Sequence, residues 1–191
     1  MNKTKRKIFE TSMKLFAEKG YDATSIEEIT ATVGVAKGTL YYHFSSKEEI
    51  FNFLVEEGMK LLKNSIEIKT SKFDNTIDKI RAIILIEMKV LAKYEHIITI
   101  ILTQFWGTEP RNLSCQSYVL DYVKTVENII QVGMDKGEIP HSNAKIMAST
   151  IFSLTYSLLV YKLQSEEPLN IQELYKEYQD IIINGLLNAD K

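Results

Sequence analysis

Residues 33–49 constrain the fold of this chain more than any other segment, and they read VGVAKGTLYYHFSSKEE. Gly34 stands between two stretches with helical patterns, where a sharply turning backbone can require a positive φ angle. Residues 36–44 include a lysine, a threonine, two tyrosines and a histidine, whose side chains can donate hydrogen bonds to phosphates or base edges. Gly38 and Thr39 are small enough to let a helix approach a DNA groove closely. The segment therefore favours DNA binding over catalysis.

Capping patterns place helix starts on both sides of this segment. Ser25 is a favourable N-cap residue, and Glu28 stands three residues later, at the spacing of a capping box. Ser46 and Glu49 repeat the pattern, so another helix is expected to begin near residue 47.

The predicted helices over residues 25–32 and 36–43, joined by a turn at 33–35, have the dimensions of a helix-turn-helix at about 25–43. The second helix would be the recognition helix. A helix over residues 4–19 precedes the motif, with apolar side chains on one face and a lysine and a glycine at its end.

The rest of the chain is also predicted to be helical. Proline or glycine marks short joints at residues 109–110, 136–140 and 166–168. No segment reads as a strand, although the run at residues 97–101 is rich in β-branched side chains. Further helices are expected over residues 47–68, 74–93, 95–106, 111–136, 142–165 and 170–188.

The composition agrees with a compact, mostly helical protein. The 191 residues are 45% hydrophobic and include 3 Pro and 8 Gly, without the Pro-rich or Gly/Ser-rich stretch of a linker. The single cysteine, Cys115, excludes an intramolecular disulfide, and His96 and His141 lack partners at metal-ligand spacing. We therefore predict no metal site and no cofactor. No Ser-His-Asp-like set, phosphate loop or convincing carboxylate pair is present, so an enzyme is not expected.

The chain is expected to be soluble and cytoplasmic. Its basic N-terminus leads into an amphipathic helix and lacks the apolar region of a signal peptide. Residues 146–161 carry no charge, but these sixteen residues include five serines and threonines and fall short of the roughly 20 residues that span a bilayer. A helix of this kind is also typical of a buried or subunit-interface position.

The net charge of −2 hides an uneven distribution. Residues 1–47 hold eight Lys and Arg against five Asp and Glu, a balance of +3, which leaves fifteen basic and twenty acidic residues, a balance of −5, for the remainder. A basic tip on an acidic body would orient the protein on DNA and keep the body away from the phosphates.

Residues 15–51 resemble the N-terminal domain of the tetracycline-repressor (TetR) family of transcriptional regulators. Three motifs carry the resemblance in order: Phe-Ala-Glu-Lys-Gly-Tyr from residue 16, Thr-Ser-Ile-Glu-Glu-Ile from residue 24, and Tyr-Tyr-His-Phe-Ser-Ser-Lys-Glu from residue 41. The resemblance implies an all-α fold of about nine helices. A helix-turn-helix DNA-binding domain would occupy residues 1–48, and a helical ligand-binding and dimerisation domain residues 49–191.

The resemblance also implies which residues meet DNA. At the leading end of the recognition helix, Lys37, Gly38 and Thr39 would meet base edges, with Tyr41 nearby or in the core. Phosphate contacts, which fix register rather than sequence, would come from a second group. This group comprises Tyr42, His43, Lys47 and a hydroxyl at the start of the preceding helix, from Thr24 or Ser25.

An effector would bind in the helical body. Aromatic and methionine side chains with a few hydroxyls suit an adaptable apolar pocket, although aromatic residues at helical spacing are more often ordinary core. The candidate effector residues are Met88, Phe105, Trp106, Tyr118, Tyr122, Phe152 and Tyr156.

Two apolar stripes predict a homodimer, in which a helix pair from each subunit forms a four-helix bundle, as the family does. Two recognition helices roughly 34–36 Å apart would then enter successive major grooves of a near-palindromic operator. The stripes comprise Ile151, Leu154, Leu158 and Tyr161 in one helix and Leu174, Tyr178, Ile181 and Ile182 in the next.

These features predict a ligand-responsive, sequence-specific transcriptional regulator, namely a repressor that a small apolar or amphipathic effector releases from its operator. The alternative is a DNA-bound interaction or architectural protein on the same fold, in which a protein surface carries the output without a small-molecule effector. A pocket that closes over a ligand would favour the first, and a flat exposed apolar patch on the body would favour the second.

Overall fold

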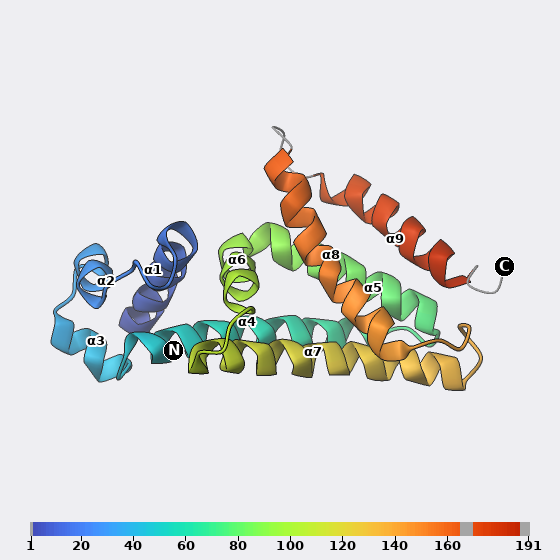
Figure 1. Cartoon of the computed structure of the whole chain (residues 1–191), viewed down its shortest axis with the longest axis horizontal. Coiled ribbons are helices and arrows are strands. Elements are labelled where there is room, and N and C mark those ends of the chain that lie inside the picture. Colours follow the sequence, from blue (N-terminus) through green and yellow to red (C-terminus); the bar gives the residue numbers. More distant parts are fainter. Residues whose placement is uncertain (1, 165–169, 188–191) are drawn as a thin grey trace. The chain divides into compact units, whose positions relative to one another are not determined.

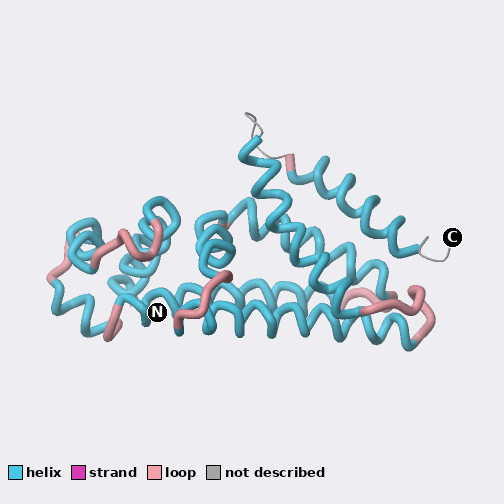
Figure 2. The backbone as a smooth tube through the Cα atoms, viewed as in Figure 1, coloured by secondary structure: helices cyan, strands magenta, loops and turns pink. Residues whose placement is uncertain are grey.

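The computed structural model describes residues 2–164 and 170–187, apart from the side chains of residues 155, 163, 186 and 187. Within these residues the chain forms nine α-helices and no strand, joined by short loops (Figures 1 and 2), which confirms the predicted all-α fold. Every helix begins and ends within two residues of its predicted bounds. The helices are α1 (Lys3–Lys19), α2 (Ile26–Val33), α3 (Lys37–His43), α4 (Lys47–Thr70), α5 (Thr76–Lys93), α6 (Glu95–Gln104), α7 (Pro110–Asp135), α8 (Ala144–Gln164) and α9 (Ile171–Leu187).

Internal contacts divide the chain into two compact units. The head unit comprises Met1–Met59 and Tyr94–Tyr118, and the body unit comprises Lys60–Lys93 and Val119–Lys191. The boundary expected between residues 48 and 49 differs from this division, because α1 packs on α6 as well as on α2 and α3. Helices α4 and α7 therefore each contribute residues to both units.

Local hydrogen bonds explain why α2 begins and ends where it does. The Ser25 hydroxyl accepts a hydrogen bond from the Glu28 N–H at 3.0 Å, as the capping box predicts. In a complete capping box the Glu28 carboxylate would also accept a hydrogen bond from the Ser25 N–H. Here that carboxylate pairs instead with Lys19 at the end of α1. At the other end, Gly34 adopts the left-handed conformation that stops the helix, and its N–H still donates to the Thr30 carbonyl oxygen. The N-cap is thus confirmed, and the carboxylate ties α2 to α1.

Aromatic side chains form the core of the head unit. The rings of Phe16 and Phe51 each lie against Tyr21, with centroid distances of 5.3 Å for Phe16 and Tyr21 and 5.3 Å for Tyr21 and Phe51. Leu40 and Phe44 are also buried, so the recognition helix is held to the core by one face. Full burial of a side chain such as leucine or phenylalanine contributes roughly 1.5–3 kcal/mol to stability.

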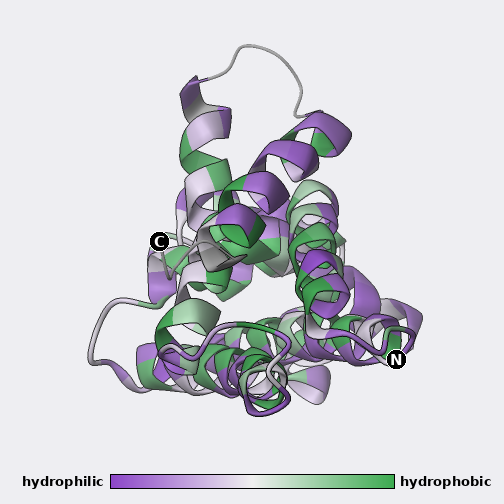
Figure 3. Cartoon of the chain, turned by 90° about the vertical axis from the view of Figure 1, so that its right-hand side faces the viewer, coloured by the Kyte–Doolittle hydropathy of each residue, from purple (hydrophilic) through white to green (hydrophobic). Residues whose placement is uncertain are grey.

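The core of the body unit lies where α5 packs against α8 and α9. Apolar and polar bands alternate along the helices (Figure 3), as amphipathic helices with one buried face require. One charged side chain lies within this apolar core, because Glu87 of α5 is fully buried. The buried apolar residues of the body unit include Ile80, Ile83, Ile84, Met88, Tyr122, Val126, Ile130, Ile151 and Leu158.

Candidate DNA interface and effector region

The turn before α3 fixes which face of the recognition helix points outward. Gly34 adopts the left-handed conformation, with φ 77° and ψ 40°. A Cβ atom at this position would meet nothing within 4 Å, so the backbone angle and not crowding requires glycine. Val35 also donates its N–H to the Thr30 carbonyl oxygen at 3.0 Å. These bonds hold the turn while Leu40 fixes α3 to the core.

The outward face of α3 presents polar side chains to solvent. The Tyr42 side chain is 83% exposed, and its ring meets the His43 ring edge-on at a centroid distance of 5.0 Å. Lys37 and Gly38 are exposed, and Thr39 and His43 are half-buried. Tyr41 also lies at the surface and not in the core. The residues expected to meet DNA on α3 therefore share an accessible surface.

Lys37 forms an ion pair with Glu27 on the surface of the head unit. The hydrogen bond between them lowers the pKa of the Glu27 carboxyl and raises the pKa of the Lys37 ammonium, and their Coulomb attraction acts in the same direction. Both side chains remain largely exposed, so the pair is open to competition from a phosphate or a base edge.

Lys47 has an internal role in the head unit that its sequence position does not reveal. Its ammonium donates to the carbonyl oxygens of Tyr21 at 2.8 Å and of Thr24 at 2.9 Å. The same nitrogen lies 4.3 Å from the centre of the Tyr21 ring. These contacts fasten the start of α4 to the turn between α1 and α2, and they leave one of the ammonium's N–H groups for a phosphate.

Thr24 does not suit the phosphate contact considered for it. Its side chain is 1% exposed, and its hydroxyl donates to the carbonyl oxygens of Leu15 and Gly20. The hydroxyl is therefore used inside the turn. Ser25 is exposed and accepts the Glu28 N–H, which leaves its own hydroxyl hydrogen to donate. Of the two alternatives, Ser25 is the accessible one.

A further contact to the same turn was not expected from the sequence. Arg111, at the start of α7, donates to the Asp22 carboxylate at 3.2 Å. Its guanidinium carbon lies 4.6 Å from the centre of the Tyr21 ring. Tyr21 is thus contacted by cations from both α4 and α7, and no local pattern connects residues so far apart in the chain.

The seven candidate effector residues fall into both units. In the head unit, the Trp106 side chain is exposed and meets the Phe105 ring edge-on at 5.1 Å, while Tyr118 is half-buried. In the body unit, Met88 and Tyr122 are buried and Tyr156 is exposed. The half-buried Phe152 ring lies 5.8 Å from the Tyr122 ring. The structure therefore brings together Tyr122 and Phe152 from this set.

Sequence reasoning missed Glu87, the polar residue next to this pair. The Tyr122 hydroxyl donates a hydrogen bond to Glu87 Oε1, and Oε2 has no hydrogen-bond partner among the described residues. Burial raises the pKa of the Glu87 carboxyl to about 8, against the smaller lowering effect of the Tyr122 bond. Burial also raises the pKa of the Tyr122 hydroxyl, and the Glu87 carboxyl adds to that effect. The available signal was a single acidic residue in the apolar run at residues 83–88.

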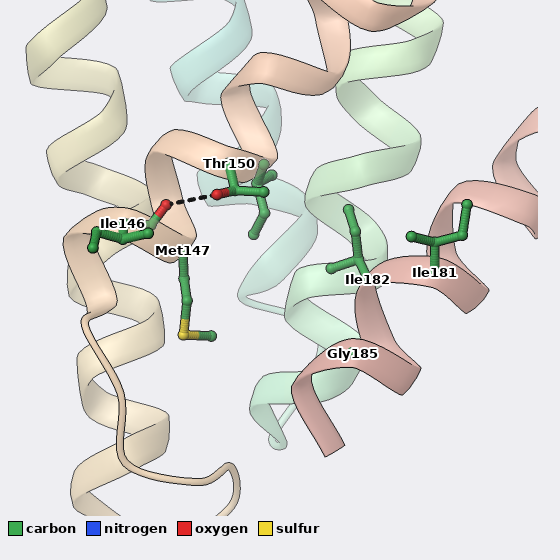
Figure 4. Close-up of a pocket in the computed structure, with 7 residues that line it drawn as sticks. Ile146, Met147, Thr150, Ile181, Ile182 and Gly185 are labelled. Atoms are coloured by element: carbon green, nitrogen blue, oxygen red, sulfur yellow. Dashed lines mark hydrogen bonds between the residues drawn. The ribbon is translucent and has the colours of Figure 1, made fainter. Parts of the chain in front are cut away.

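An apolar groove of about 260 Å³ lies between α8 and α9 in the body unit (Figure 4). Thr150 contributes no free hydroxyl hydrogen to it, since that hydroxyl donates to the Ile146 carbonyl oxygen at 2.9 Å. The groove is lined by Ile146, Met147, Thr150, Ile151, Ile181, Ile182 and Gly185.

The predicted dimer residues differ in their availability. Ile151, Leu158 and Leu174 are buried within the chain, because they pack inside the body unit, so they cannot form an outer stripe. Tyr161 and Ile181 are exposed, and the Ile181 side chain is 72% exposed. Leu154, Tyr178 and Ile182 are half-buried. Exposed apolar residues that the prediction did not include are Ile146 and Val160, with Tyr156 beside them on α8.

Helix α8 is long and apolar enough over Ala144–Lys162 to cross a membrane by length and composition, and 24% of that window is buried within the chain. Helices that pack inside soluble proteins pass the same test. A single helix of this kind is weak evidence for a membrane span.

Residues 8–54 match the family described as bacterial regulatory proteins, tetR family. This segment therefore has the sequence of a tetR-family domain. The matched residues extend from α1 into α4 and include every residue expected to meet DNA. The candidate effector and dimer residues all lie outside them.

One known regulator is similar to part of this chain, and two solved structures are similar to most of it. IcaR of Staphylococcus aureus, an HTH-type negative transcriptional regulator of the biofilm operon icaADBC, is 39% identical over 74 residues, which are 39% of this chain and 40% of IcaR. The chain therefore matches about two fifths of the length of that relative. A Clostridium perfringens protein described as a candidate regulator of fatty acid metabolism is 28% identical, with a TM-score of 0.89 over 94% of this chain and 98% of that one. FadR from Bacillus subtilis, solved with stearoyl-CoA, shares the fold at 20% identity, with a TM-score of 0.82 over 95% and 98% of the two chains.

Proposed function

We propose that this protein is a sequence-specific DNA-binding regulator that represses transcription as a homodimer until a small apolar or amphipathic effector releases it from its operator. The observation that carries the proposal is the geometry of α3. Leu40 holds the helix to the core, while the face bearing Lys37 and Tyr42 is open to solvent within the residues that match the family. The description of IcaR as a negative regulator supports repression as the output.

The exposed face of α3 suits a major groove. Gly38 offers no side chain, and a Cβ there would meet nothing within 4 Å, so the helix can approach the bases closely at this point. Lys37 and Thr39 are the proposed base contacts, because they flank this glycine. On DNA, the Lys37 ammonium would leave the Glu27 carboxylate and donate instead to a guanine or phosphate oxygen.

Phosphate contacts are proposed for the side chains at the rim of this surface. Tyr42 is the most exposed of them, and its hydroxyl is a donor suited to a phosphate oxygen. Ser25 and His43 lie on the head unit with accessible side chains, and Lys47 contributes its remaining N–H group. Tyr41 would contact the sugar and phosphate backbone or the side of the groove.

A second copy of the chain is the proposed partner of the outer face of α8 and α9. This face presents Ile146, Val160, Tyr161 and Ile181 as exposed apolar side chains. Their burial against the same face of a partner follows from two-fold symmetry, in which each subunit supplies an identical surface. Two linked heads would then contact both halves of a near-palindromic operator.

The effector proposal rests on the body unit. Bacillus subtilis FadR has the same fold and was solved with stearoyl-CoA, so helices in this arrangement can hold an apolar chain with a polar end. An effector shifts operator affinity only through its different affinities for the two shapes of the protein, and couplings of about 1–3 kcal/mol are typical.

Fluorescence anisotropy with two duplexes tests the DNA-binding proposal. One duplex carries the sequence upstream of the gene and the other a shuffled copy, and both are titrated at two salt concentrations. A preference of about 10³ or more for the upstream duplex that changes little with salt is expected. Equal and strongly salt-dependent binding would favour the alternative, an architectural protein on the same fold. Absence of binding at either salt concentration would contradict the assignment of α3 to DNA.

Tyr42→Phe is expected to weaken binding to the upstream and shuffled duplexes by a similar factor, about 10-fold or more. The substitution removes only the hydroxyl, and hydrogen bonds to charged groups contribute roughly 1.5–3 kcal/mol. Anisotropy measures the affinities, and the midpoint of thermal unfolding is expected to stay unchanged because the side chain is 83% exposed. Lys37→Ala is the contrasting variant, which should weaken the upstream duplex more than the shuffled one. Loss confined to the upstream duplex in Tyr42→Phe would assign Tyr42 to base recognition instead.

Lys47→Met is expected to destabilise the head unit as well as to weaken DNA binding. The methionine cannot donate to the Tyr21 and Thr24 carbonyl oxygens, and the loss of such bonds costs about 1–3 kcal/mol. Thermal unfolding measures the first effect, and the salt dependence of operator affinity measures the second. Lys14→Met, at an exposed lysine of α1, is the control. An unchanged unfolding midpoint would contradict the internal role of Lys47.

A further inference from the structure

The most unusual polar group in the body unit is the Glu87 carboxyl. Its side chain lies on α5 at 1% exposure, surrounded by a core that is otherwise largely apolar. The Tyr122 hydroxyl, from α7, donates to Oε1. Oε2 is buried and has no hydrogen-bond partner in the described part of the chain. A buried polar atom left in this way costs about 1–3 kcal/mol, so it requires an explanation.

The geometry determines which partner would satisfy this oxygen. Oε1 accepts the Tyr122 hydroxyl hydrogen, so a proton on a neutral carboxyl resides on Oε2, which is then a donor. Burial favours this neutral state, as the raised pKa of Glu87 indicates. A neutral acceptor such as a carbonyl oxygen completes the hydrogen bond without ionising the carboxyl. A cationic ligand would require the carboxyl to lose its proton first.

The surroundings define the rest of the ligand. Tyr122 is covered on one side by Phe152 of α8, at a centroid distance of 5.8 Å, and Phe152 is half-buried. Phe152 is thus a partly exposed neighbour of the buried Tyr122 ring, and a change of its rotamer would uncover one side of that ring. Met88, the neighbour of Glu87 on α5, is an unbranched side chain that can adapt to an apolar occupant. A ligand at this point would be apolar apart from the group that meets Glu87.

We propose that Glu87 and Tyr122 form the polar end of the effector site, and that Glu87 Oε2 donates a hydrogen bond to an uncharged carbonyl oxygen of an otherwise apolar effector. The inference rests on the effector part of the proposed function. It adds Glu87 to the site and restricts the effector to neutral molecules that carry a hydrogen-bond acceptor.

Binding of two matched probes to the full chain tests this proposal. Methyl decanoate carries an apolar chain and a neutral carbonyl, and decylammonium carries the same chain with a cation. The variants are Glu87→Gln, which keeps a donor and an acceptor, and Glu87→Met, which keeps the length and removes both. Glu67→Met, at an exposed carboxylate of α4, is the control. Calorimetry measures the dissociation constants, and thermal unfolding verifies that each variant is folded.

The proposal predicts that wild type, Glu87→Gln and Glu67→Met bind methyl decanoate within about threefold of one another. Glu87→Met should bind it roughly tenfold more weakly or worse, because the carbonyl is left without a donor. Equal affinities of wild type and Glu87→Met, or no binding to wild type, would overturn the proposal. Tighter binding of decylammonium that is lost in Glu87→Gln would also overturn it and would indicate a cation site.

Release from DNA is measured separately, by adding methyl decanoate to the complex with the upstream duplex. Binding that depends on Glu87 without release would refute the effector part of the proposed function and leave the site assigned. If methyl decanoate releases Glu87→Met from the duplex as strongly as it releases wild type, the effector binds elsewhere. That result would overturn the Glu87 inference and would leave the proposed regulator function in place.

Discussion

Ile181→Asp is expected to separate the proposed homodimer into monomers and to lower operator affinity by a factor on the order of 10² or more. The Ile181 side chain is 72% exposed in the single chain, so the substitution leaves the fold of one subunit intact. In a symmetric dimer it would bury an unpaired carboxylate from each subunit, at a cost of at least about 3 kcal/mol. The two heads would then bind as separate units and lose the advantage of linked half-sites.

Sedimentation measures the mass of the variant in solution, and anisotropy measures its affinity for the upstream duplex. Ile68→Asp is the matched control, because Ile68 is 65% exposed on α4 and lies outside the proposed dimer face. The control is expected to remain a dimer with unchanged affinity. A dimeric Ile181→Asp variant would exclude this part of α9 from the subunit interface.

The second large effect concerns the pH dependence of stability. The free energy of unfolding is expected to fall by about 3 kcal/mol between pH 4.5 and 7 through Glu87 alone. The Glu87 carboxyl of the unfolded chain loses its proton above its ordinary pKa of 4.5, whereas burial holds the pKa of the folded form at about 8. The folded state therefore binds more protons in this window, and stability falls as pH rises. The decline ends above the folded pKa, where both states are ionised.

Denaturant unfolding at fixed protein concentration measures this decline over the range from pH 5 to 8. Glu87→Gln should flatten it, because the amide does not titrate, while Glu67→Gln at an exposed position should leave the decline in place. Tyr122→Phe should extend the decline to higher pH without changing where it begins, since the Tyr122 hydrogen bond lowers the pKa of Glu87 in the folded state. Identical profiles for wild type and Glu87→Gln would show that the carboxyl is not buried in solution.

The sequence by itself determined the helices and the recognition segment. Helix bounds follow from apolar spacing, N-caps and glycine stops, which are relations between residues three or four positions apart. For this reason Ser25 caps α2 as expected, and Gly34 ends it. In the structure Leu40 and Phe44 are buried and Tyr42 is exposed, because one face of a short helix must pack against its neighbours. The Glu28 carboxylate does not make the capping-box contact that the pattern predicts, because it forms an ion pair with Lys19.

Only the tertiary structure decided what the polar side chains contact. Lys47 donates to carbonyl oxygens 23 and 26 positions earlier in the chain, and Tyr122 donates to a glutamate 35 positions earlier. Thr24 is buried by the turn that Lys47 fastens, although its neighbour Ser25 is exposed. An apolar residue on the packed face of a helix is buried whichever helix covers it, so local periodicity predicts much of the core, although it also placed the exposed Ile181 in an apolar stripe. The partner of a charge or hydroxyl depends on which distant helices meet and at what angle, and the packing of the whole chain sets that.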